Sequence, residues 1–154
     1  MAGLYFEDFE DGQLIHHPIR RTITESDNTL FSVMTMNPAA LHLDHHYAQT
    51  QTPFGKPLVN SLLTLGVMIG ISVHDTTLGT TVANLGMTDV VFPKPVFHGD
   101  TIKAQTRVIS KRASKSRAGQ GIVEFDHTAF NQHGDEVARC RRQALMLMRP
   151  HEDA

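Results

Sequence analysis

One short polar segment carries the side chains best suited to acid–base chemistry. It contains Asn37, His42 and Asp44 and is broken by Pro38, yet apolar stretches typical of helices lie on both sides of it. A histidine takes up or releases a proton near neutral pH, whereas an amide orients water but cannot take its proton. We therefore expect His42 to transfer protons and Asn37 to orient a water molecule, while Asp44 fits a helix N-cap better.

The start of the most apolar stretch in the chain is the second chemical feature. Asn60 and Ser61 are good N-cap residues, and we expect the helix after them to run to about Val73 and to be buried on most sides. The first N–H groups of a helix lack intrahelical partners, and the helix dipole favours negative charge there. The backbone N–H of Ser61 or Leu62 is therefore predicted to stabilise the oxyanion of an activated carbonyl compound, by about 3 kcal/mol per donor.

Two further helices are predicted around the polar segment. Thr24 and Asp27 form a capping-box pattern that opens a helix, and this helix ends by Pro38. A second short helix is expected over about 44–49. These two helices would hold the polar segment against the start of the apolar helix.

The second half of the chain reads as strands. Residues 4–18 are expected to be irregular and residues 19–23 to form a short strand, before four longer strands and a basic hairpin loop over 111–121. The four segments are 80–91, 101–109, 122–130 and 137–148. A long buried helix followed by a four-stranded meander predicts the α+β class, with an antiparallel sheet wrapped around the helix. Apolar residues at every position of 144–148 suggest a second buried face and hence at least a homodimer.

Composition limits the classes of protein that fit. The 154 residues predict a single domain over 1–154 with its core over about 5–148, and the net charge of −2 gives no sign of nucleic-acid binding. The single Cys140 excludes an internal disulfide framework and a cysteine-rich zinc site. An acidic N-terminus without a signal-peptide pattern, and no apolar run long enough to span a membrane, predict a cytoplasmic protein. The scattered histidines lack metal-ligand spacing, so no metal is expected.

Three segments in the same order and spacing resemble those of MaoC-type hydratases, over about residues 5–148. They are 35–44, 55–61 and 95–101, and the corresponding family patterns are T-G-D-x-N-P-x-H-x-D, G-x-P-x-x-H-G and P-V-x-x-G-D-x-L. The resemblance implies a hot-dog fold and reversible addition of water to an enoyl-CoA thioester. It implies no cofactor, since CoA is part of the substrate.

The chain departs from this family at two positions. In an ungapped alignment, the acid–base aspartate of the family falls on Asn37, and the His-Gly at the helix start falls on Asn60 and Ser61. An alternative alignment pairs Asn37 and Pro38 with the Asn-Pro of the family but shifts His42 out of register. These departures resemble the subgroup that acts on branched or dicarboxylic substrates such as mesaconyl-, itaconyl- or methylglutaconyl-CoA.

The resemblance also gives roles to residues outside the polar segment. It implies that Asn60 contacts the substrate, and that Lys115 and Arg117 of the basic loop contact CoA phosphates or a substrate carboxylate. The usual interpretation of such a basic loop is a solvated hairpin. Two other functions stay open: an acyl-CoA thioesterase, and an acyl-CoA-binding or regulatory protein without catalysis, which the absence of the family aspartate at Asn37 would suit.

Overall fold

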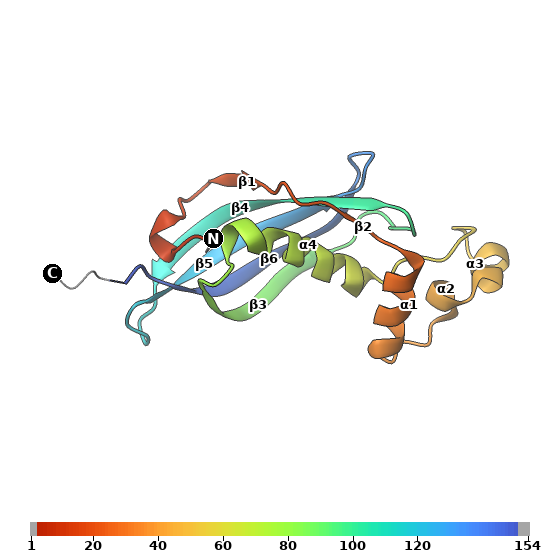
Figure 1. Ribbon diagram of the computed structural model, residues 1–154, viewed down its shortest axis with the longest axis horizontal. Helices are drawn as coiled ribbons and strands as arrows, with labels where there is room; N and C mark the ends of the chain where they lie inside the picture. The colour runs from red at the N-terminus through yellow and green to blue at the C-terminus, as the bar shows by residue number, and fades with distance from the viewer. Residues whose placement is uncertain (1–2, 151–154) are drawn as a thin grey trace.

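The fold, seen in a computed structural model that describes residues 3–150, is one long helix held in a curved sheet, with a group of shorter helices at one end (Figure 1). The elements follow one another in this order: η1 (Phe6–Asp8), β1 (Leu14–His16), β2 (Arg21–Thr22), α1 (Glu25–Met34), α2 (Ala40–Leu43), α3 (His45–Gln51), α4 (Ser61–Thr76), β3 (Thr81–Val91), β4 (Thr101–Ala113), β5 (Gln120–Phe130) and β6 (Glu136–Leu147).

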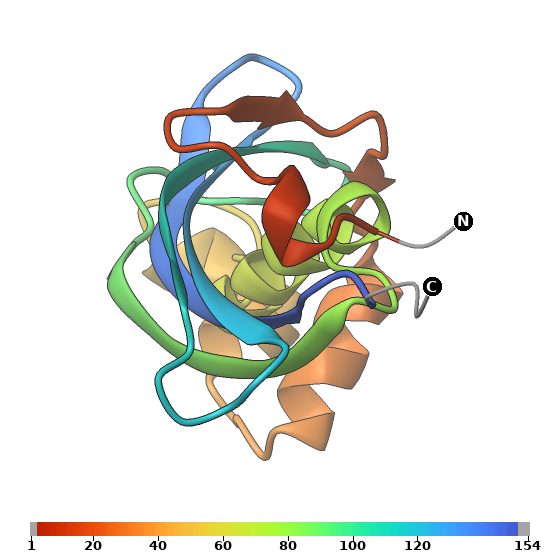
Figure 2. The ribbon, with the colours of Figure 1, turned by 90° about the vertical axis from the view of Figure 1, so that its left-hand side faces the viewer.

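The strands form an antiparallel sheet in the order β1-β4-β5-β6-β3, with β2 also paired to β4. Viewed from its end, the sheet curves around α4 (Figure 2). The predicted α+β arrangement is therefore confirmed. The predicted meander is wrong, because β3 pairs with β6 instead of β4. After β3 the chain passes through Pro93 and Pro95, which lack the N–H needed for a hairpin ladder. It then crosses from the β3 edge of the sheet towards the opposite edge, where β4 lies.

Local signals located the helices well. The capping box predicted at Thr24 and Asp27 is present, and α1 follows it. α3 begins after Asp44, whose Oδ1 accepts from the Tyr47 N–H at 2.9 Å, so the N-cap role expected for Asp44 is confirmed. The expectation that α4 is buried on most sides is confirmed, with one exposed stripe that begins at Leu62 and continues through Gly66, Gly70 and His74.

Sequence patterns were less reliable for the N-terminal segment. Residues 4–18 contain η1 and β1 rather than irregular chain, and the strand expected over 19–23 is reduced to β2. β1 is three residues long and exists because it pairs with β4. A strand of that length has too few residues for a pattern to show before its partner is known. The basic loop is also shorter than expected, because β4 and β5 extend into it.

A polar layer divides the core along the strands. On β4 the inward positions are Ala104, Thr106 and Val108: Ala104 packs in one apolar cluster and Val108 in another, with Thr106 between them. The first cluster holds α4 residues such as Met68, and the second includes Phe125. The sheet and helix are therefore joined by two apolar regions on either side of a buried hydrogen-bonded layer.

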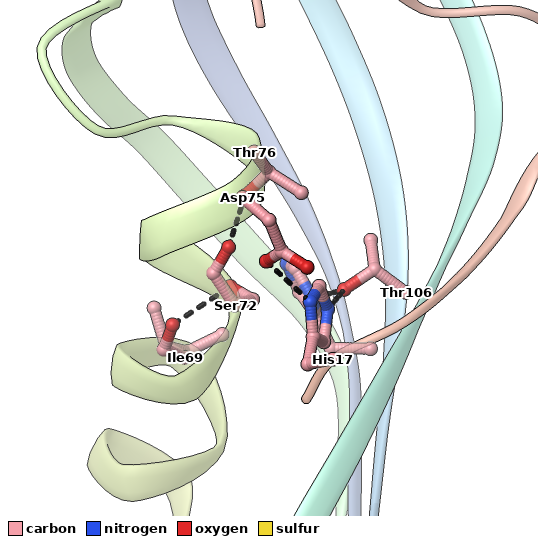
Figure 3. A network of polar contacts seen from close by, with 7 residues as sticks. His17, Ile69, Ser72, Asp75, Thr76 and Thr106 are labelled. Atoms are coloured by element: carbon pink, nitrogen blue, oxygen red, sulfur yellow. Dashed lines mark hydrogen bonds and ion pairs between the residues drawn. The ribbon is translucent and has the colours of Figure 1, made fainter. Parts of the chain in front are cut away.

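That layer is a chain of five side chains, part of which is drawn in Figure 3. Arg142 Nε donates to His127 Nε2 at 3.0 Å, and His127 Nδ1 lies 2.8 Å from Thr106 Oγ1. Thr106 Oγ1 lies 2.7 Å from His17 Nε2, and His17 Nδ1 lies 2.7 Å from Asp75 Oδ1. A guanidinium only donates and a carboxylate only accepts, so with both imidazoles neutral each bond is donated in the direction from Arg142 towards Asp75. Burial, reinforced by the charge of Arg142, holds the pKa of His127 well below its usual range.

Exposed apolar side chains lie on and just after α1, at Leu30, Val33, Met34 and Met36, and along β3, whereas on β6 Leu147 is exposed only at the end of the strand. Leu145 and Met146 are buried within the chain itself, so the apolar run of β6 does not require a second subunit. Large apolar side chains are exposed instead along β3 and just after it, at Val82, Leu85, Val90, Val91 and Phe92. Within residues 3–150, no helix is long and apolar enough to cross a membrane.

Candidate active site

His42 lies on α2, a single helical turn between α1 and α3, close to the segment that leads into α4. Its side chain is 8% exposed, and its Nδ1 lies 2.7 Å from the backbone oxygen of Leu58. A carbonyl oxygen only accepts, so Nδ1 carries the proton and donates it. In a neutral ring Nε2 is then the unprotonated nitrogen, which is the state required of a general base.

Asn37 has a local role that the sequence also allowed. Its Oδ1 accepts from the Ala39 N–H at 3.0 Å, a turn that leads the chain into α2. Its own N–H donates to the Ser32 carbonyl at 2.8 Å. In the described part of the chain no hydrogen bond joins the side chains of Asn37 and His42, and the Nδ2 of Asn37 has no partner there, so it can donate to a water molecule.

The start of α4 provides one free donor rather than two. Asn60 is the N-cap predicted by the sequence, and its Oδ1 accepts from the Leu62 N–H at 3.1 Å. The Leu62 N–H is thus already used, while the Ser61 N–H has no partner among residues 3–150. Asn60 is itself 4% exposed and caps the helix. The substrate contact expected of Asn60 stays a prediction beside this capping role, and the free N–H at the start of α4 is that of Ser61.

Asn28, which the sequence analysis missed, links these parts. It is fully buried on α1, and its Oδ1 accepts from the Asn60 N–H at 2.8 Å. Its Nδ2 lies 3.0 Å from the Leu58 oxygen, the same atom that receives the proton of His42, and 3.0 Å from His98 Nε2. A polar residue on a helix gives no sign of such partners, because they lie 30 or more residues away.

A cavity of about 240 Å³ opens beside the first turn of α4. Its lining is mainly apolar, and Lys94 is its only charged residue. The lining includes Phe54, Leu58, Ser61, Thr64, Phe92 and Val137. His42 is connected to this cavity through the Leu58 backbone. Small-molecule sites of drug size usually have ~300–1,000 Å³, so this cavity suits a short acyl group.

The loop between β4 and β5, which contains Lys115 and Arg117, lies at the opposite end of the molecule from α2, which carries His42 (Figure 1). Both residues follow β4, which begins next to the site at Thr101 and continues for 13 residues. At about 3.3 Å per residue, β4 carries the basic loop roughly 40 Å away. A substrate bound at His42 of the same chain would lie far from Lys115 and Arg117, and their predicted contact with CoA phosphates or a substrate carboxylate stays a prediction. The sequence showed a basic loop but not at which end of the sheet it lies.

Glu25, His45 and His98 form a cluster close to the site. Their ligand atoms lie within 4.8 Å of one another, and His45 Nε2 is 2.9 Å from Glu25 Oε1. Burial lowers the pKa of His98, with Glu25 opposing and His45 adding to the effect. His98 Nε2 accepts from Asn28, so its proton is on Nδ1. A metal-bound neutral imidazole carries its proton on the other nitrogen, so a metal on either nitrogen would break the Asn28 bond. The donor set does not fit a metal centre.

The antiparallel sheet around one long helix and the site at the helix start define the class. The arrangement is the hot-dog fold. A solved Mycobacterium tuberculosis protein that is described as having a double hotdog fold matches it with a TM-score of 0.83 and 25% identity, over 99% of this chain and 46% of that one. A family model described as a MaoC like domain matches residues 8–129, and the chain belongs to this family.

Relatives of this family include CoA hydratases and dehydratases. Mesaconyl-CoA hydratase of Cereibacter sphaeroides is 30% identical over 96% of this chain and 42% of its own length. Beta-methylmalyl-CoA dehydratase of Chloroflexus aurantiacus is 35% identical over 96% of this chain and 41% of its own length. The (R)-specific enoyl-CoA hydratase of Rhodospirillum rubrum is 30% identical over 82% of this chain and 90% of its own length. The chain thus spans about two fifths of the length of the first two relatives.

Two solved structures complete the comparison. A putative MaoC domain dehydratase from Chloroflexus aurantiacus has a TM-score of 0.89 and 30% identity, covering 99% of this chain and 42% of that one. A protein from Archaeoglobus described as a monoamine oxidase regulatory protein has a TM-score of 0.84 and 31% identity, covering 97% and 98%.

Proposed function

We propose that this chain is a hydratase that adds water reversibly to the double bond of a short enoyl-CoA thioester. The observation that carries the proposal is the His42–Leu58 hydrogen bond, which leaves Nε2 as a base near the start of α4. In hydration, Nε2 takes a proton from water as the water oxygen bonds to Cβ. The electrons of the double bond move onto the thioester as an enolate, and the same proton is then delivered to Cα on the same face. The Ser61 N–H would hold the enolate oxygen, and Asn37 would orient the water through its Nδ2.

The cavity and the relatives support a short, branched or dicarboxylic acyl group. A volume of about 240 Å³ suits a few carbons, and Lys94 at the lining, whose Nζ pairs with Asp135, would exchange that partner for a substrate carboxylate. The names of the relatives, mesaconyl-CoA hydratase and beta-methylmalyl-CoA dehydratase, suggest the same class of substrate. The reaction as proposed needs no cofactor besides the CoA of the substrate.

The same proposal includes a homodimer paired through β3. The edge strand β3 exposes a row of apolar side chains with free backbone groups, which invites pairing with another strand. Relatives more than twice as long as this chain, and a solved relative with a double hot-dog fold, support a second copy as the partner. Light scattering behind size exclusion tests this: a monomer at micromolar concentration would contradict it.

A second candidate is an acyl-CoA-binding or regulatory protein without catalysis. Two observations favour it: Asn37 replaces the aspartate of the family and its oxygen is already bonded, and the Archaeoglobus neighbour is described as regulatory. One assay separates these candidates and the thioesterase. Enoyl-CoAs of four to six carbons, linear and dicarboxylic, are incubated with the protein while absorbance of the conjugated thioester and free thiol are followed. Loss of absorbance without thiol supports the hydratase, thiol release supports a thioesterase, and neither change supports a binding protein.

A further inference from the structure

Asn28 is the most connected buried amide beside the site, and its orientation is determined by its neighbours. The Asn60 N–H only donates, so the Asn28 atom facing it must be Oδ1. The Leu58 carbonyl only accepts, so the atom facing it must be Nδ2. The remaining Nδ2 hydrogen points to His98 Nε2, which must then accept. All the strong hydrogen-bonding positions of this buried side chain are therefore used.

Two of the three main-chain groups that the Asn28 side chain contacts lead to different parts of the proposed chemistry, and the third is the His42 oxygen, 3.4 Å from Nδ2. The Leu58 oxygen accepts the Nδ1 proton of His42 and so sets which nitrogen of His42 is the base. Asn60 caps α4, so the position of its N–H sets that of the next residue, Ser61. One rigid amide thus connects the base to the oxyanion donor, and it does so from α1, an element that contributes neither group.

We propose that Asn28 is a positioning residue, which fixes the spacing between the Nε2 of His42 and the N–H of Ser61. This inference rests on the proposed function, because the two groups act together only in a reaction such as hydration. Misplacing reacting groups by about 1 Å can cost ~10²-fold in rate. Asn28 is fully buried and absent from the cavity lining, so its loss should lower kcat much more than it changes KM.

The kinetic test compares variants that affect the same helix in different ways. Asn28→Leu keeps most of the volume but removes every hydrogen bond, and Asn28→Ala also removes volume. Thr24→Ala is the matched control, because it removes the side-chain N-cap of α1 but none of the side-chain hydrogen bonds of Asn28, and the Thr24 carbonyl that accepts from the Asn28 N–H is retained. We expect kcat to fall about 10- to 100-fold in both Asn28 variants with KM within about threefold, and kcat to stay within about twofold in Thr24→Ala. Asn28→Leu turning over as fast as Thr24→Ala would overturn the proposal.

A spectroscopic test does not depend on turnover, and its first readout is made on the parent protein. Nitrogen NMR distinguishes the two neutral tautomers of histidine. His42 and His98 are both predicted to be protonated on Nδ1, although free histidine in water favours Nε2. The His42 signals are identified by their loss in His42→Gln and those of His98 by their loss in His98→Leu. In Asn28→Leu, His98 should change to the Nε2-protonated form and His42 should become a mixture of tautomers.

The two tests separate failure of this inference from failure of the proposed function. A parent protein that hydrates no enoyl-CoA would remove the proposed function, and with it the catalytic purpose of Asn28, whichever tautomers are observed. An active parent in which either histidine is protonated on Nε2 would leave hydration standing and overturn the role of Asn28.

Discussion

The most direct test of the proposed chemistry is replacement of His42 by glutamine. Glutamine can still donate to the Leu58 oxygen, but its amide cannot take a proton from water. A general base contributes about 10²–10⁴-fold in rate, which corresponds to roughly 2.7–5.4 kcal/mol of activation free energy. The structural cost should be smaller, because the hydrogen bond affected is worth about 1 kcal/mol of unfolding free energy. We therefore expect His42→Gln to remain folded and to lose 10²–10⁴-fold in kcat.

The assay is loss of the conjugated absorbance of an enoyl-CoA, with urea unfolding measured on the same samples. His46→Gln is the control, because His46 is exposed on α3 and its side chain makes no hydrogen bond within residues 3–150. It should keep full activity. If His42→Gln keeps more than about a tenth of the parent activity, the base is another group and the tautomer argument for His42 does not describe catalysis.

Four other outcomes are expected. Asn37→Ala should lower kcat/KM through kcat alone. Asn37→Asp should be tolerated on a linear enoyl-CoA but less on a dicarboxylic one, because like charges at ~4 Å repel by about 1 kcal/mol or more. Equal activity of Asn37→Ala and the parent on both substrates would remove Asn37 from the mechanism. Lys94→Gln should raise KM for a dicarboxylic substrate by severalfold and leave a linear one unchanged. Thr106→Val should lower the free energy of unfolding by about 2–4 kcal/mol in urea, because two buried imidazoles lose a partner, whereas Thr128→Val should change it by less than about 1 kcal/mol. Folded His127 stays neutral on acidification, whereas the same imidazole in the unfolded chain takes up a proton below pH ~6.5. The free energy of unfolding should therefore fall by up to about 1.4 kcal/mol per pH unit below that pH, and the slope should be smaller in His127→Gln.

Local sequence signals predicted local structure. The cap of α1 at Thr24, the cap of α3 at Asp44 and the cap of α4 at Asn60 each involve hydrogen bonds between residues two or three apart. Such contacts depend on a few neighbouring residues, so their patterns can be recognised without the fold. The alternation of the long strands is local in the same sense, which is why the class of fold was predictable.

Partners distant in the sequence were not predictable from these patterns. The pairing of β3 with β6 joins segments separated by β4 and β5, and nothing within β3 distinguishes that partner from β4. The position of Lys115 depends on the direction and length of β4. For both, the residue types were visible but their place in space follows from the whole topology, so the predicted meander failed and the end of the sheet at which the basic loop lies could not be predicted.

The site shows the same division within a single cluster of side chains. His42 and Asn37 were identifiable because they stand in a short pattern, but their states depend on residues outside it. The backbone of Leu58 decides which nitrogen of His42 is free, and Asn28 holds that backbone from a helix formed earlier in the chain. A family that keeps the histidine while varying the aspartate therefore still needs a scaffold that orients the ring. In this chain the orienting groups are a carbonyl and a buried amide, both uncharged, so the orientation of His42 does not depend on the missing carboxylate.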